Sequence, residues 1–399
     1  MTTARRIGTG ERRARLAARH HLAPAARARD VVQAAGSLVG LHGTDPATVF
    51  LAARARVRAA EASVGSIERA LYDDRSLVRM LGMRRTMFAV PADVAPIIHA
   101  ACTRAIAARE RQLQVRLFAS IPAAAADTAA WVDEVERSTI EALAARGEAF
   151  ATELAADEPR LRERIVLAEG KSYQAGANIT SRVLFLLAAE GRIVRGRPRG
   201  SWISSQYRWS STDAWLGGPM AELPTAEAQV ELMRRWLGTF GPATAADARW
   251  WTGWTMGEVR RSFDRLGAVE VDLDGAAGHV LPGDDGPARS PSGEPWVALL
   301  PALDPTVMGW LDRTWYLGAH GPALFDRTGN AGPTVWLDGR IVGGWAQRRD
   351  GTIAVRLLED VGREASAAVV HEADRLGAWI GPVRVTPRFR TPLERDLSA

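Results

Sequence analysis

The 399-residue sequence contains one cysteine, one lysine and no long apolar run. A single thiol, Cys102, excludes an intramolecular disulfide framework, and seven scattered histidines do not complete a cysteine-based zinc module. No stretch approaches the ~18 uncharged apolar residues that a membrane helix needs, and no hydrophobic signal segment follows Arg5 and Arg6. We therefore expect a protein that neither crosses a membrane nor is secreted, and that works in the reducing cytoplasm.

Several catalytic motifs are also missing. The sequence has no His-Glu-x-x-His metal motif, no Gly-x-Ser-x-Gly nucleophile motif, no Gly-x-x-x-x-Gly-Lys phosphate loop and no Gly-x-Gly-x-x-Gly dinucleotide motif. These absences argue against metal-assisted hydrolysis, acyl transfer, ATP use and nicotinamide chemistry. We expect chemistry that needs no metal and no cofactor.

The composition is that of a folded chain with an uneven charge. Apolar residues make up 47% and charged residues 24%, as in globular proteins, and the length fits two to four domains. Residues 1–58 hold eleven arginines against three acids, a net charge of +8, so the remainder sums to −3. Such a bias is typical of a protein with a polyanionic partner, although an arginine-rich, solvated helix face explains it as well.

One order of elements recurs three times: a helix, a short helix, a helix and then two strands. The first repeat has expected helices at about 11–21, 28–40, 46–58 and 64–72, a β-like run at 77–90, a helical segment at 92–118 and a linker at 120–123. The second has helices at 131–146 and 150–156, a helix ending near Gly191, and strands at 192–195 and 201–209. The third has helices at 225–238, 243–251 and 256–266 and strands at 269–273 and 279–281.

A different pattern follows a Pro/Gly/Asp-rich linker at 282–295. Its expected elements are strands at 296–300, 334–348, 352–358 and 383–386 and one helix at 363–379. The sequence thus predicts an α+β fold of three tandem winged helix-turn-helix units and a small C-terminal β-barrel-like domain. The expected boundaries are 1–120, 121–222, 223–285 and 286–399.

Short motifs in this order resemble the AlkZ/YcaQ family of bacterial DNA glycosylases. They are Gly40-Leu41-His42-Gly43-Thr44-Asp45-Pro46, Met83-Arg84-Arg85-Thr86, Gly191-Arg192-Ile193-Val194-Arg195-Gly196, Leu299-Leu300-Pro301-Ala302-Leu303-Asp304-Pro305, Met308-Gly309-Trp310 and Gly343-Gly344-Trp345. The resemblance implies removal of bulky or crosslinking alkyl adducts from purine nitrogens, in DNA repair or antibiotic self-resistance. It also implies a concave surface that reaches the sugar while the adduct stays outside. The family's Gln-apolar-Gln or Gln-apolar-Asp triplet is replaced here by His42-Gly43-Thr44.

The catalytic candidates are His42, Thr44 and Asp45. Asp45-Pro46 predicts a helix start, because an aspartate caps free N–H groups and proline is tolerated at the first helical position. A turn at a helix N-terminus suits a phosphate or a polarised water. We expect His42 to position or deprotonate the water and Thr44 to orient it, while Asp45 adds negative potential or serves simply as a cap. A hydrogen-bonded turn histidine is the alternative for His42.

The candidates for DNA binding are basic residues of two hairpins. The segment Arg195-Gly196-Arg197-Pro198-Arg199 is typical of a minor-groove hook at a hairpin tip, with Trp202 beside it or packed beneath. In the first hairpin, Arg84 and Arg85 are expected on phosphates unless they are only solvated. Trp250, Trp251 and Trp254 fit a core patch, and Asp304 a turn.

These expectations combine into one function. The chain is predicted to be a monomeric, monofunctional DNA glycosylase that hydrolyses the N-glycosidic bond of bulky N7-alkylated purines in duplex DNA, at the nucleoid. Its single lysine, Lys171, argues against a Schiff-base step with the abasic sugar. The alternatives are a non-catalytic winged-helix DNA-binding protein, as a regulator or lesion sensor, and a protein-interaction module.

Overall fold

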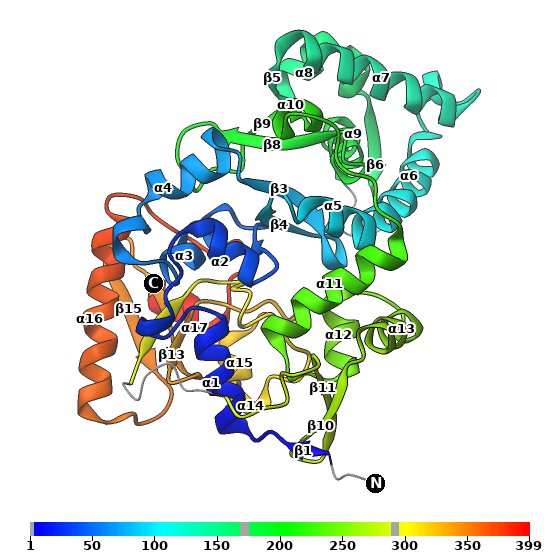
Figure 1. Cartoon of the computed structure of the whole chain (residues 1–399). Coiled ribbons are helices and arrows are strands. Elements are labelled where there is room, and N and C mark those ends of the chain that lie inside the picture. Colours follow the sequence, from blue (N-terminus) through cyan, green and yellow to red (C-terminus); the bar gives the residue numbers. More distant parts are fainter. Residues whose placement is uncertain (1–3, 168–174, 289–294) are drawn as a thin grey trace.

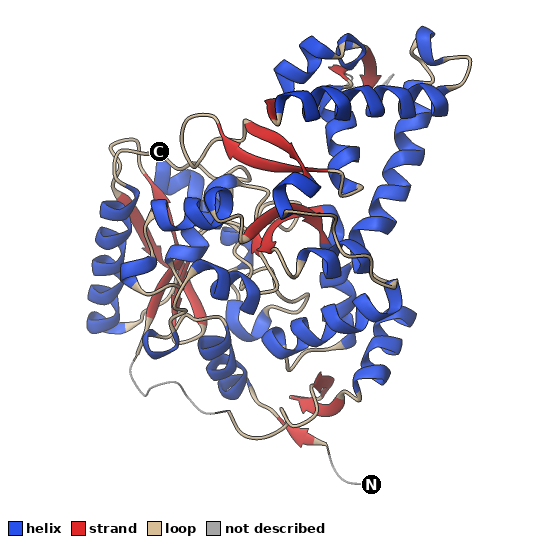
Figure 2. Cartoon of the chain, turned by 45° about the horizontal axis from the view of Figure 1, so that its top comes forward, coloured by secondary structure: helices blue, strands red, loops and turns tan. Residues whose placement is uncertain are grey.

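The computed structural model describes residues 4–167, 175–288 and 295–399. Lys171 lies outside these residues. Helices dominate the molecule, and its small sheets lie between them (Figure 2). The first repeat occupies the middle of the view in Figure 1, the second the top and the third the lower right, with the C-terminal domain at the lower left.

The first repeat builds a three-stranded antiparallel sheet behind its helices. The sheet order is β2-β4-β3, so that the short strand just before α3 pairs with the last strand. Its elements are α1 (Thr9–Arg19), α2 (Val31–Ser37), β2 (Leu41–His42), α3 (Pro46–Arg54), α4 (Val64–Glu68), β3 (Leu77–Gly82) and β4 (Thr86–Pro91). Every residue of α3 is buried, which fixes the turn just ahead of it.

The second repeat has the same topology, with the sheet order β5-β9-β8. It follows α5 (Ala95–Ile98) and the long α6 (Arg104–Phe118), which rises toward it in Figure 1. Its elements are α7 (Thr128–Arg146), β5 (Glu148–Phe150), α8 (Ala151–Asp157), β6 (Arg164–Leu167), β7 (Ala175–Asn178), α9 (Thr180–Ala189), β8 (Ile193–Pro198) and β9 (Tyr207–Ser211). The predicted C-cap Gly147 is confirmed, because it ends α7 at a φ of +73° that favours glycine.

The third repeat reduces the first strand to one bridge, between Ala243 and His279. It follows α10 (Thr212–Leu216) and consists of α11 (Thr225–Phe240), α12 (Ala245–Thr252), α13 (Met256–Leu266), β10 (Val269–Leu273) and β11 (Ala276–Val280). The N-terminal strand β1 (Arg5–Arg6) adds to β10 in parallel. The N-terminal strand and the hairpin of the third repeat, which are far apart in the sequence, thus form one small sheet.

The C-terminal domain is an open sheet, so the expectation of a β-barrel is wrong. Its described strands run in the order β12-β13-β14-β15 without closing. They are β12 (Val297–Leu300), β13 (Thr334–Leu337), β14 (Arg340–Gln347) and β15 (Ile353–Leu357), accompanied by α14 (Thr314–Leu317), α15 (Gly321–Leu324), α16 (Gly362–Ile380) and α17 (Pro392–Ser398). The helix α16 packs against both β12 and β15, the two edge strands.

The strand expected at 383–386 is also wrong, because that segment is irregular. Pro382 and Pro387 flank it and supply no N–H groups for a ladder. The side chain of Gln347 satisfies the segment instead: it accepts from the Val385 N–H at 2.8 Å and donates to the Val383 carbonyl at 3.2 Å. A side chain from β14 therefore holds the segment where a strand partner was expected.

The hairpin of the second repeat differs from the prediction in its register. Arg195, Gly196, Arg197 and Pro198 belong to β8, and the loop covers 199–206, so these residues do not form the tip. A register shift between Arg195 and Pro198 interrupts the ladder, and the Arg199 N–H closes the loop on the Gln206 carbonyl at 2.8 Å. The predicted strand at 201–209 is accordingly shortened to β9.

The arginine-rich N-terminal segment is largely neutralised inside the molecule. Seven of its arginines pair with carboxylates, in the ion pairs Arg5–Glu11, Arg6–Asp274, Arg15–Glu11, Arg19–Asp284, Arg29–Asp30, Arg54–Glu372 and Arg56–Asp304. Most of these acids come from beyond residue 270. The positive excess of residues 1–58 thus balances acids elsewhere and does not mark a polyanion surface.

The core has two main parts. One large cluster runs through the first repeat, the third repeat and the C-terminal domain, while the second repeat has a separate cluster of its own. Trp251 and Trp254 lie in the large cluster and Trp250 packs against it, as the core-patch interpretation requires. None of the described helices combines the length and apolarity needed to traverse a bilayer.

Candidate functional site

The turn ahead of α3 is held at both ends. His42 pairs with Phe88 of β4, and the Gly43 N–H donates to the Met87 carbonyl at 2.7 Å. On the helix side, the Asp45 carboxylate accepts from the Ala47 N–H at 3.1 Å, which confirms the predicted cap. Thr44 stands between these anchors and is only half-buried.

Asp45 also joins two distant parts of the chain. Its second carboxylate oxygen accepts from the backbone N–H of Arg388 at 2.9 Å, across 343 positions of sequence. Burial raises the pKa of Asp45, while the hydrogen bonds from Arg388 and Ala47 work against that rise. With both oxygens engaged by the backbone, Asp45 fixes the turn and the C-terminal segment to each other.

His42 is a buried and neutral side chain. It is 7% exposed, its ring lies 5.6 Å from that of Phe88, and its Nδ1 has no hydrogen-bond partner. Burial lowers the pKa of His42 to about 3, and the charge of Arg84 acts in the same direction. The imidazole is therefore uncharged near neutral pH and is a weak base, better suited to hydrogen bonding than to taking a proton.

A cavity of ≈ 520 Å³ opens beside the turn and is lined by three parts of the chain. Thr44 comes from the first repeat, Arg195, Arg199, Gln206 and Tyr207 come from the second, and Arg388 comes from the C-terminal segment. Blue, green and red parts of the ribbon in Figure 1 thus contribute to one site. The structure brings Thr44 together with Arg195 and Arg199, but it does not place His42 or Asp45 among the lining residues.

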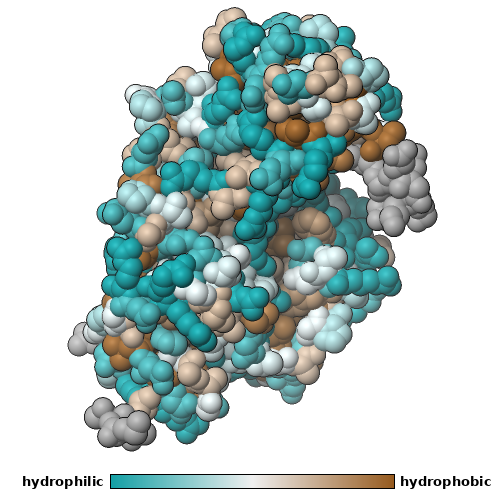
Figure 3. All heavy atoms as spheres, turned by 90° about the vertical axis from the view of Figure 1, so that its right-hand side faces the viewer, coloured by the Kyte–Doolittle hydropathy of each residue, from teal (hydrophilic) through white to brown (hydrophobic). Residues whose placement is uncertain are grey.

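The described lining of this cavity contains four basic or amide side chains and no carboxylate. Among the residues that the structure describes, no three His, Cys, Asp or Glu side chains cluster in a way that could hold a metal. Figure 3 shows the right-hand side of the molecule as seen in Figure 1, and this face is largely hydrophilic. The cavity is therefore a cationic, polar recess.

Arg195 and Arg199 rest on aromatic rings. The Arg195 guanidinium lies 5.6 Å from the ring centre of Tyr207 and 5.4 Å from that of Trp209. Arg199 lies 4.2 Å from the ring centre of Phe150. Such stacking orients a guanidinium while leaving its N–H groups free for an acceptor.

The remaining basic candidates have partners within the protein. Arg197 pairs with Glu68 at 3.2 Å and with Asp73 at 2.7 Å. Arg85 pairs with Glu110 at 2.6 Å. Arg84 lies 3.8 Å over the ring of Trp250 in the third repeat. None of these three lines the cavity, and the charges of Arg85 and Arg197 are paired with acidic side chains.

Trp202 lies inside the molecule. It is 6% exposed, and its ring lies 5.2 Å from that of Phe50 and 5.7 Å from that of Trp379. This packing draws the loop 199–206 back onto the first repeat and α16. A buried ring between two others cannot stack on a DNA base, so Trp202 is removed from the candidate interface. Asp304, expected in a turn, is fully buried and pairs with Arg56 at 2.6 Å.

Two basic residues were missed by the sequence prediction. Arg388 lines the cavity. Arg79, at the centre of β3, lies 5.2 Å from the ring centre of Tyr207, which also lines the cavity. A charged residue within the apolar run Leu77-Val78-Arg79-Met80-Leu81 was a usable signal for Arg79. No local pattern could have found Arg388, since the sequence does not show which segments meet.

Comparisons with known proteins agree with this picture. A family model described as DNA glycosylase AlkZ-like matches residues 35–379. Among solved structures, the Streptomyces sahachiroi DNA glycosylase AlkZ is similar with a TM-score of 0.67 and 22% sequence identity, over 93% of this chain and 97% of that chain. At that identity, the likeness concerns the fold. The search of curated proteins gave no match.

Proposed function

Since the chain belongs to the AlkZ-like DNA glycosylase family, we propose that it hydrolyses the N-glycosidic bond of bulky N7-alkylated purine nucleotides in duplex DNA. Family membership supports glycosylase activity and implies DNA as the partner. The observation that carries the proposal is the recess in which Thr44 meets Arg195, Arg199 and Arg388. A cationic recess beside a capped turn suits a polyanionic substrate whose sugar must approach that turn.

Departure of the alkylated base needs little assistance from the protein. A purine alkylated at N7 is cationic and leaves as a neutral base, so its departure needs no strong acid. The site must hold a water on the far face of the sugar and stabilise an oxocarbenium-like transition state. We assign the water-facing hydroxyl to Thr44.

His42 and Asp45 act behind Thr44. Because the pKa of His42 lies near 3, we assign His42 to holding the turn through its packing and strand pairing with Phe88, and not to removing a proton. Asp45 adds its negative charge beneath the site while capping α3. Both are therefore positioning residues.

The fold fits the handling of a duplex. We propose that the three repeats are winged-helix units bounded at residues 1–120, 121–222 and 223–285, followed by the domain 286–399, and that together they cup DNA as a monomer. A bulky adduct then stays outside the recess while the sugar is reached. Such an enzyme would act at the nucleoid in the cytoplasm and could confer resistance to a DNA-alkylating natural product.

The reaction is proposed to stop at the abasic site. None of the described residues is a lysine, so no described side-chain amine is present to form a Schiff base with the sugar aldehyde. Borohydride treatment during turnover should trap no covalent protein–DNA adduct. A trapped adduct would overturn this part of the proposal, with Lys171 as the first suspect.

The deciding experiment is incubation with duplex DNA that carries N7-alkylguanine, followed by chemical cleavage at abasic sites. The wild type should release the base, and Thr44→Ala should slow release by about tenfold to a hundredfold through loss of the hydroxyl contact. Thr328→Ala, on an exposed turn of the C-terminal domain, is the matched control and should turn over normally. Equal rates for both variants would remove Thr44 from the mechanism, and undiminished release by His42→Ala would remove His42.

A non-catalytic DNA-binding protein is the second candidate. It is favoured by the replacement of both family glutamines and by the position of His42 outside the cavity lining. The same assay discriminates, because such a protein binds duplex DNA with salt-dependent affinity but releases no base. A protein-interaction module would show no salt-dependent DNA affinity at all.

A further inference from the structure

Arg79 is a buried cation with no carboxylate partner in the described structure. It is 4% exposed, and none of its three guanidinium nitrogens has a hydrogen-bond partner. The groups beside it are the phenol groups of Tyr72 and Tyr207, which raise the pKa of Arg79 although burial alone would lower it. A buried, unpaired cation is costly, so its retention calls for a compensating group.

Two further arginines converge on the same place without a carboxylate between them. Burial lowers the pKa of Arg195, and the nearby charges of Arg79 and Arg388 act in the same direction. Arg195 and Arg388 line the cavity, while Arg79 is buried and lies 5.2 Å from the ring centre of Tyr207. We call Arg79, Arg195 and Arg388 the arginine triad. Three mutually repelling cations at one recess form a site complementary to an anion.

We infer that the arginine triad binds one phosphodiester of the DNA strand that carries the lesion, with the sugar of that nucleotide next to Thr44. The inference rests on the proposed function. Guanidinium groups donate paired hydrogen bonds to phosphate oxygens, so Arg195 and Arg388 contact the phosphate directly. Arg79, buried near Tyr207, acts through its charge.

Arg388 links the phosphate to the catalytic turn. Arg388 is an exposed residue that lines the cavity, while its backbone N–H donates to the Asp45 carboxylate. A phosphate bound by this side chain therefore lies at a fixed place relative to the turn that Asp45 caps. The same residue thus both binds the strand and sets where the sugar meets Thr44.

The experiment uses the full chain and duplexes that contain a stable abasic-site analogue, so that no base release is needed. Single phosphates around the analogue are replaced, one at a time, by neutral methylphosphonates. We expect wild-type affinity to fall about tenfold or more at one position and little elsewhere. In Arg388→Ala and Arg195→Gln, affinity for the unmodified duplex should fall similarly, with no further loss at that one position.

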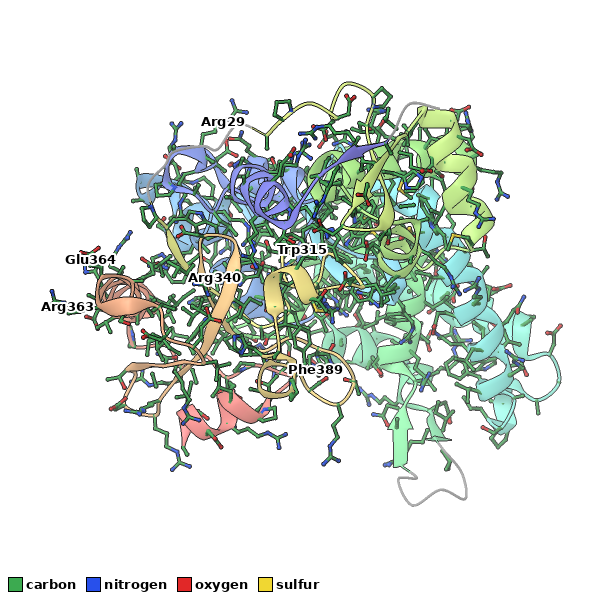
Figure 4. All side chains as sticks on the ribbon, turned by 90° about the horizontal axis from the view of Figure 1, so that it is seen from below. Arg29, Trp315, Arg340, Arg363, Glu364 and Phe389 are labelled. Atoms are coloured by element: carbon green, nitrogen blue, oxygen red, sulfur yellow. The ribbon has the colours of Figure 1, made fainter. Side chains whose placement is uncertain are left out.

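Arg29→Ala is the matched control. Arg29 is an exposed arginine at the edge of the molecule away from Phe389, the neighbour of Arg388 (Figure 4). It should bind like the wild type and keep the position-dependent loss. Arg388→Lys keeps the charge and the backbone contact and should recover part of the affinity. Thermal unfolding of every variant identifies any that loses affinity by misfolding.

Uniform losses along the strand, or additive losses in Arg388→Ala, would overturn the inference. A second arm titrates inorganic phosphate at constant ionic strength. A rise in wild-type Tm that is absent in Arg388→Ala, without any position-dependent methylphosphonate effect, would assign the recess to free phosphate instead. A position-dependent effect in a protein that releases no base would leave the phosphate site standing and reject the proposed glycosylase.

Discussion

Two groups of arginines in this molecule differ in their spacing along the sequence and in whether carboxylates pair with them. The N-terminal group, within residues 1–58, is dense, and seven of its members pair with carboxylates. The arginine triad is scattered over more than three hundred positions and has no carboxylate partner in the described structure. The density of arginine along a sequence therefore says little about where an anion binds. What decides whether an arginine can bind an anion is whether a carboxylate of the protein already pairs with it.

The contrast is sharpest between two buried arginines. Arg56 is fully buried, and its guanidinium donates to both carboxylate oxygens of Asp304, at 2.6 and 2.8 Å, and to the Ala52 carbonyl. Arg79 is almost as deeply buried and makes no hydrogen bond. We assign Arg56 to stability, because it ties the first repeat to the C-terminal domain, and Arg79 to binding.

Removal of Asp304 is expected to have the largest effect. Asp304→Ala leaves Arg56 as an unpaired buried charge and should lower the free energy of unfolding by about 3–5 kcal/mol. Urea denaturation followed by tryptophan fluorescence measures it. Asp274→Ala, which breaks the exposed pair with Arg6, is the control and should cost far less, because solvent screens that pair. Similar losses in both variants would show that burial does not separate these ion pairs.

Replacement of Arg79 should act in the opposite direction on stability. Arg79→Met removes a charge without a partner and keeps the apolar stem, so the free energy of unfolding should rise by about 1–3 kcal/mol. Affinity for the abasic-analogue duplex should fall at the same time. Chemical denaturation and a binding titration on one preparation check both. A clear loss of stability would mean that Arg79 is a structural residue like Arg56, and the contrast between the two would disappear.

His42, unlike the two buried arginines, is a buried side chain that is neutral in the folded protein. Its pKa is about 3 in the folded chain and about 6.5 when unfolded, so below pH 6.5 the unfolded state takes up a proton that the folded state refuses. The free energy of unfolding therefore falls with falling pH, by about 1 kcal/mol between pH 7.5 and pH 6.

The glutamine variant isolates this contribution, because other buried histidines titrate in both proteins. His42→Gln should show a shallower pH dependence of stability than the wild type over that interval. Parallel curves would indicate that His42 is accessible to protons in the folded protein and could serve as a base.

Local chemistry made several features predictable. Asp45-Pro46 predicted the start of α3, and Gly147 predicted the end of α7, because each residue satisfies or permits one particular backbone geometry. Helices with a clear apolar face, such as the predicted 225–238 and 256–266, appear in the structure as α11 and α13 within two residues of the expected bounds. Thr44, chosen from its place in the turn, does line the cavity.

Other features depend on contacts between distant segments. The position of Arg195 on β8, and not at a tip, follows from a register shift and from the burial of Trp202 against Phe50 and Trp379. The pairing of Arg197 with Glu68 joins the second repeat to the first. Neither the register shift nor the ion pair between the repeats can be predicted from the local sequence. A strand was expected at 383–386, but the flanking prolines and the hydrogen bonds from Gln347 leave this segment irregular.

The bond between the Arg388 N–H and the Asp45 carboxylate has a consequence for synthesis in the cell. A ribosome makes the turn early and the residue that completes it more than three hundred codons later. A nascent or prematurely terminated chain thus carries the early repeats without a finished site. The contact that completes the turn therefore cannot form before residue 388 has been synthesised.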